Sequence, residues 1–149
     1  SGTTGTQEQA LAAATTETLI NAIAEASSVL TLITWSVSFD GVSLTAEPVS
    51  IQLGKSDQTA AGTGTGFTPK QDKGPTRTAQ FTATVLFTAE PTTIAVHHRV
   101  LIHPAGGSIF VQFPLGREFE QSTTADGIPL SATAPAVVNA QSMMQLEEA

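Results

Sequence analysis

Three histidines are the side chains whose types first suggest chemistry, because an imidazole can bind a metal ion or transfer a proton. They lie in the segment HHRVLIH, residues 97–103. In an extended strand His97 and His103 share one face but stand about 20 Å apart, so they cannot bind one metal ion together. His98 points to the opposite face, among apolar neighbours, which favours an interior or interface position. We therefore expect no metal centre and no cofactor.

The carboxylates, glycines and hydroxyls form no recognisable catalytic pattern. Glu118 and Glu120 lie on the same side of the segment GREFEQ, whereas the acid and base of a glycosidase face one another across a cleft. A solvated strand edge is the simpler interpretation of this pair. The glycine-rich run AGTGTGFTPK lacks the Gly-Lys-Ser/Thr ending of a phosphate-binding loop, and no G-x-S-x-G nucleophile elbow occurs. We expect no catalytic residues and no enzyme activity.

The composition favours strands around a single core. The chain has 149 residues, the size of one domain, and it contains no cysteine, which excludes disulfides and thiolate metal sites. Charged residues make up only 13% of the sequence, and threonine, serine, glycine and proline supply much of the polar remainder. Surface helices normally carry Glu, Lys and Arg, so this balance predicts an all-β protein. No apolar run is long enough to cross a bilayer.

Alternation with a period of two predicts where the strands lie. In the segment ITWSVSFDG the side chains of Ile33, Trp35, Val37 and Phe39 share one face, and serine and threonine share the other. We expect the Trp35 face to enter the core. Comparable alternation occurs at 49–53, at 81–87, at 94–102 (with Ile94, Val96, His98, Val100 and Ile102 on one face) and at 109–113. With further segments towards the C-terminus this makes about eight strands, which predicts a two-sheet antiparallel β-sandwich, jelly-roll or immunoglobulin-like.

Two segments stand apart from this pattern. Residues 1–15 are small and polar and are predicted to form an N-terminal arm, followed by a single β-sandwich domain over residues 16–149. Within that domain, residues 54–79 are predicted to form one long loop. Residues 7–26 are compatible with helix or strand, and we favour a strand over residues 16–24.

The charge distribution points to the arm and the loop as partner-binding segments. The net charge is −7, yet residues 54–79 carry four cations and two acids, so this segment is +2 and the remainder is −9. An acidic body with one mildly basic loop does not suit nucleic acid, which needs many clustered cations. It suits a loop that reaches an acidic protein surface, although loops are also simply where charge is tolerated. The predicted partner-binding residues are Lys55, Lys70, Lys73 and Arg77 of the loop and Thr3 and Thr4 of the arm.

A series of short segments occurs in an order that resembles a known group of proteins. The segments are WSVSFDGVSLTAEPVSIQL, GTGTGFTPKQDKG, FTAEPT, HPAGG, QFPLGREF and SATAPAVVNAQSMMQLEE. Over residues 16–148 the sequence resembles small β-rich virion proteins of tailed bacteriophages. The resemblance implies a structural role, as a decoration (cement) subunit on the capsid surface made in the bacterial cytoplasm. It implies no catalytic residues. Its partners would be the major capsid protein and copies of the chain itself, for which we expect a trimer.

Two other functions remain open at this point. The same resemblance is compatible with a tail or neck component of the virion. A carbohydrate-binding β-sandwich is a hypothesis from a different class, but such modules usually display exposed aromatic platforms. This chain has no tyrosine, and its one tryptophan fits the core face of a strand.

Overall fold

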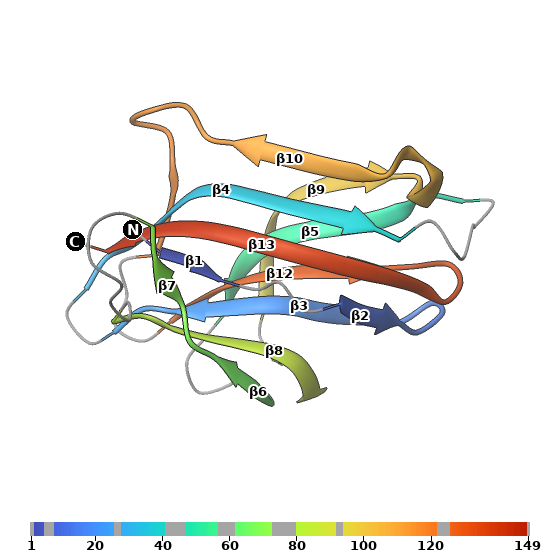
Figure 1. Ribbon diagram of the computed structural model, residues 1–149, viewed down its shortest axis with the longest axis horizontal. Coiled ribbons are helices and arrows are strands. Elements are labelled where there is room, and N and C mark those ends of the chain that lie inside the picture. The colour runs from blue at the N-terminus through green and yellow to red at the C-terminus, as the bar shows by residue number, and fades with distance from the viewer. Residues whose placement is uncertain are drawn as a thin grey trace.

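A computed structural model describes residues 2–4, 8–25, 28–40, 47–56, 62–72, 80–91, 94–121 and 126–148. Over these residues the protein is nearly all β, with one turn of 3-10 helix, η2 (Pro104–Gly106). The strands form two antiparallel sheets that share one apolar core (Figure 1). The predicted fold class, a two-sheet antiparallel β-sandwich, is confirmed.

The seven-stranded sheet is built around two long neighbouring strands, β4 and β13. Its members are β1 (Gly2–Thr4), β2 (Glu8–Leu11), β4 (Leu30–Phe39), β7 (Lys70–Gln71), β10 (Ser108–Gln112), β11 (Phe119–Gln121) and β13 (Val138–Glu148). Strands β10 and β11 follow one another along the outer side of β4. Strands β2 and β1 follow one another along the far side of β13, and β7 lies outside β1.

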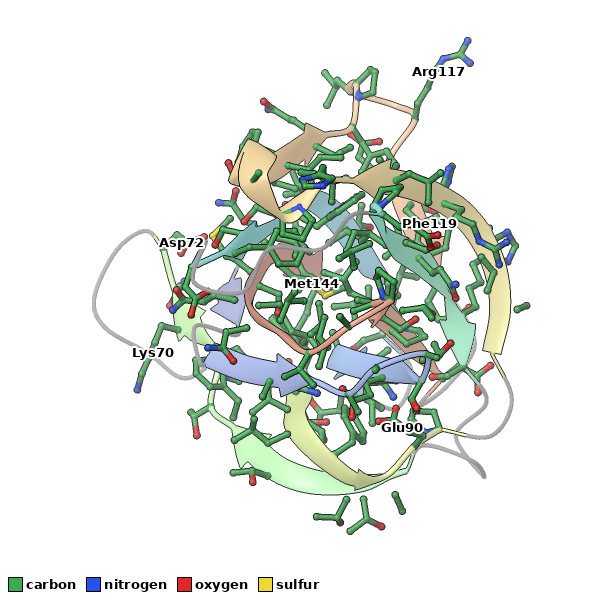
Figure 2. The ribbon with its side chains drawn as sticks, turned by 90° about the vertical axis from the view of Figure 1, so that its right-hand side faces the viewer. Lys70, Asp72, Glu90, Arg117, Phe119 and Met144 are labelled. Atoms are coloured by element: carbon green, nitrogen blue, oxygen red, sulfur yellow. The ribbon has the colours of Figure 1, made fainter. Side chains whose placement is uncertain are left out.

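The six-stranded sheet has the order β6-β8-β3-β12-β5-β9. Its members are β3 (Thr16–Ile23), β5 (Val49–Ser56), β6 (Thr63–Phe67), β8 (Thr82–Ala89), β9 (Ile94–Ile102) and β12 (Gly127–Thr133). Strands β3, β12 and β5 form its buried centre, and β6 and β9 are its edges. The core lies between the two sheets, where Met144 of β13 is fully buried among side chains of both (Figure 2).

Strand β4 bears out the prediction for Trp35 but departs from simple alternation. Trp35 and Val37 are buried in the core, as expected, whereas Ile33 and Phe39 are only half-buried. The register with β13 shifts at this point: Gln145 lies opposite Thr34, and the next residue along lies opposite Leu32. Ile33 is therefore the extra residue of a β-bulge, which lets side chains on both sides of it face the core.

The ambiguous N-terminal segment forms the strand that we favoured. Residues 16–23 form β3, which pairs with both β8 and β12 at the centre of the six-stranded sheet. Thr18 to Ala22 are all buried, without the polar alternation of a surface strand. A bulge at Leu19, where the register with β12 shifts, accounts for part of this continuous burial. Strand β5 follows its predicted pattern, with Val49, Ile51 and Leu53 buried.

The predicted arm and the predicted loop both contain strands. Residues 2–4 and 8–11 pair with β13, and Leu11 is completely buried in the core. Residues 63–67 pair with β8 as the edge of the six-stranded sheet. These strands were not predicted, because they are only three to five residues long and too short to show a clear apolar alternation.

Candidate interaction surface

The N-terminal residues and the central segment meet at one edge of the seven-stranded sheet. Thr3 of β1 lies opposite Gln145 of β13 on one side and opposite Lys70 of β7 on the other. Residues that are far apart in the sequence thus form one continuous surface, the β1–β7 edge (residues 2–4 and 70–71). The pairing between β1 and β7 extends over two residues, so few backbone hydrogen bonds hold the outer strand.

A positive charge is presented to solvent at the β1–β7 edge. The side chain of Lys70 is exposed, and Figure 2 shows it pointing away from the sandwich. Two residues further on, Asp72 Oδ2 accepts a hydrogen bond of 2.8 Å from Gln145 Nε2 and so fastens the end of β7 to β13. The β1–β7 edge therefore presents one exposed lysine, and the strand that carries this lysine is held to β13 at its end. The protein as a whole has a net charge of −7.

The structure brings together some of the six predicted partner-binding residues and separates others. Thr3 and Thr4 lie in β1, with Lys70 beside them. Lys55 lies on β5 in the other sheet, so it does not belong to this edge. Lys73 and Arg77 lie outside the described residues.

Lys55 belongs to a second cluster, which links the two sheets. Its Nζ atom lies 5.3 Å from the ring centroid of Phe119 on β11, within the range of a cation–π contact. The rings of His97 and His98 approach the same phenylalanine edge-on, with centroid distances of 5.5 and 5.7 Å. Phe113 stacks on Phe119 at 6.5 Å. We name these five residues the ring cluster.

A β-bulge in β9 explains why two consecutive histidines contact one ring. Leu53 lies opposite His98 and Gly54 lies opposite Val96, so His97 is the extra residue. A bulge turns neighbouring side chains towards a similar side instead of opposite faces. His98 was predicted to lie in the interior or at an interface. The interior position is wrong, because its side chain is exposed and that of Val96 is 42% exposed, whereas an interface position stays a prediction.

The described side chains at these two places make packing and hydrogen-bond contacts. In the ring cluster the imidazoles pack against phenylalanine, as in other edge-on aromatic pairs. Within the described part of the chain, no group of three or more His, Cys, Asp or Glu side chains is placed to hold a metal ion. None of the helical structure described is long and apolar enough to cross a membrane.

Sequence reasoning missed an apolar surface formed by β10 and the turn that follows it. Phe110 of β10 is 63% exposed, and Leu115 is 97% exposed. Leu115 occupies a turn closed by a hydrogen bond of 2.9 Å from Arg117 N to Pro114 O, in which Gly116 has φ +81°. A type II turn requires this conformation at its third residue, which suits glycine. The sequence signal was the run SIFVQFPLG, which contains no charged residue.

Comparison with known proteins found no protein-family model, no curated protein and no solved structure that matches this chain. The class that the molecule itself defines is a two-sheet antiparallel β-sandwich, in which the described N-terminal strands lie along β13.

Proposed function

We propose that the protein is a non-enzymatic structural subunit of a bacteriophage virion, most specifically a capsid decoration protein that attaches through the β1–β7 edge. The observation that carries this proposal is the meeting of the N-terminal strand with the central segment at the border of one sheet. The order of segments that resembles small virion proteins supports the same role. A rigid sandwich that presents its outer strands at one border suits a subunit that binds a repeating surface through many modest contacts.

The charge distribution supports a protein as the partner. Lys70 is exposed at the β1–β7 edge, whereas the chain outside residues 54–79 has a charge of −9. The exposed Lys70 on an otherwise acidic body can steer the subunit towards an acidic patch on a capsid protein.

Charge reversal at the edge tests the proposed attachment. Lys70→Glu is expected to weaken cosedimentation with purified cognate capsids by about tenfold or more, because it places a negative charge against an acidic surface. The matched control is Arg99→Glu, which makes the same change at an exposed position on β9 of the other sheet. The control should bind as the unchanged protein does.

A truncation addresses the contribution of β1 separately. Removing residues 1–7 deletes β1 but keeps β2, whose Leu11 is buried in the core. We expect the truncated protein to unfold cooperatively and to lose capsid occupancy. Full occupancy by both the truncated protein and Lys70→Glu would overturn attachment through this edge. Electron microscopy of labelled particles separates a capsid location from a tail or neck location.

A further inference from the structure

Strand β10 is an edge whose outer side has no strand partner among the described residues. It pairs with β4 on its inner side and lies at the upper border of the molecule in Figure 1. The other edges are less suited to pairing. Strands β7, β11 and β2 have only two, three and four residues, β6 contains two glycines and a register shift, and β9 carries a bulge and Arg99. Strand β10 has five residues in regular register.

We propose that β10 pairs in antiparallel fashion with β10 of a second copy of the chain, about a two-fold axis through Phe110. The pairing would join two seven-stranded sheets into one continuous sheet. This inference rests on the proposed function and assigns a surface through which copies of the protein meet. It proposes a dimer in place of the trimer that the resemblance led us to expect.

The backbone of β10 is oriented for this pairing. Phe39 N donates to Gly107 O at 2.9 Å, and Phe113 N donates to Ile33 O at 3.0 Å, so Gly107 and Phe113 point towards β4. Hydrogen-bonding direction alternates along an antiparallel strand. The residues in register between them therefore alternate as well, and the N–H and C=O groups of Ser108, Phe110 and Gln112 point away from β4. These outward groups form the row that an added strand would bind.

The side chains of β10 are arranged symmetrically about its central residue. The sequence SIFVQ places Phe110 between two β-branched residues and places a polar residue at each end. A two-fold axis through Phe110 pairs aromatic with aromatic, Ile109 with Val111, and Ser108 with Gln112. Ile109 and Val111 are half-buried against the core, and Phe110 is 63% exposed. Self-pairing would cover that exposed ring.

The charge distribution favours a second copy as the partner. Residues 104–116 contain no Asp, Glu, Lys or Arg, although the whole chain has a net charge of −7. A charged group close to a two-fold axis lies near its own equivalent, so an edge with charges of one sign would repel itself. Strand β10 is neutral along its whole length and avoids this repulsion.

The mass of the protein in solution gives the first test. Sedimentation equilibrium over protein concentrations from about 1 μM to 1 mM covers dissociation constants typical of weak dimers. We expect the mass to rise from that of the 15.4 kDa chain to twice that value. A mass that stays at one chain over the whole range, or that converges on three chains, would overturn pairing about a two-fold axis.

Complementary charges at position 110 test the register directly. Phe110→Lys and Phe110→Glu should each remain monomeric, because the axis brings two like charges together. An equimolar mixture of the two variants should regain the dimer mass, because the charges then oppose one another. The same pair of substitutions at Val137, which is 56% exposed in the β12–β13 turn, is the control and should leave the wild-type mass unchanged. Dimers of wild-type strength in both single variants at position 110 would refute the proposed axis.

Circular dichroism checks that each variant is folded before its mass is compared. If Phe110→Lys does not fold, Phe110→Ser serves as a neutral substitute and should weaken the dimer by about tenfold. Lys70→Glu, the variant that tests capsid attachment, should keep the dimer. A monomeric wild type whose capsid binding is lost in Lys70→Glu would reject self-pairing while leaving the proposed function intact.

Discussion

At the scale of single residues, the centre of the six-stranded sheet contains a polar contact that only a glycine can accommodate. Asn21 of β3 is completely buried, and its Oδ1 atom accepts a hydrogen bond of 3.4 Å from Ser56 Oγ of β5. Gly127 of β12 lies between these strands, opposite Ser56 and Ile23. A Cβ atom at position 127 would come within 2.6 Å of Ser56 Oγ and would also clash with Asn21 Oδ1.

The first prediction concerns this glycine. Gly127→Ala should lower the free energy of unfolding by about 1–3 kcal/mol, because the added methyl group overpacks a rigid interior. Urea denaturation followed by the fluorescence of Trp35 measures the loss. Gly66→Ala on β6 is the matched control, since a Cβ atom there meets nothing within 4 Å. Equal stability losses in the two variants would contradict the tight packing around position 127.

At the scale of elements, the ring cluster joins strands of opposite sheets. Lys55 and the two histidines come from β5 and β9, whereas Phe119 comes from β11. Phe119 is the shared partner of the cluster, because three other rings and one ammonium group contact it. Its removal should therefore affect both sheets.

The second prediction replaces this ring while keeping an apolar side chain. Phe119→Leu should cost at least about 0.5–1.5 kcal/mol through the loss of aromatic contacts. The imidazole proton resonances of His97 and His98 should lose their ring-current shifts, and those of His103, which is outside the cluster, should stay in place. Unchanged resonances of His97 and His98 would show that the cluster does not form in solution.

The sequence predicted the elements that bury side chains and missed those that depend on a partner strand. Trp35 and the alternating residues of β5 followed from periodicity alone, because burial on one face leaves that pattern. The bulges at Ile33 and His97 did not follow, because a bulge is defined by the register with a neighbouring strand. That is why the interior position considered for His98 was wrong.

The interaction surface was predictable only in part, for the same reason. Charge segregation singled out Lys70, and composition singled out Thr3 as part of a terminal segment. Their position beside one another arises from strand pairing between distant parts of the chain, which no local pattern encodes. Lys55 was grouped with Lys70 because the two are close in the sequence. The fold places Lys55 in the other sheet, where it belongs to the ring cluster.

At the scale of the whole molecule, the described chain starts and ends at the same end of the sandwich. Gly2 lies opposite Leu146, and Figure 1 shows both ends of the chain close together there. Strands β1 and β7 lie at one side of the seven-stranded sheet, and β10 lies at the other side of the same sheet. The proposed capsid contact and the proposed self-pairing therefore use different borders, so one subunit could make both contacts at once.

Electron cryo-microscopy of the intact virion tests the proposed function most directly, because it locates the subunit and identifies its contacts in one measurement. We expect density for the two-sheet sandwich on the outer surface of the capsid, with the β1–β7 edge and Lys70 against the shell. Particles made with the variant that lacks residues 1–7 should lose this density. Two results would contradict a decoration role. In one, the capsid surface is bare and the protein lies elsewhere in the virion; in the other, the protein is absent from the virion.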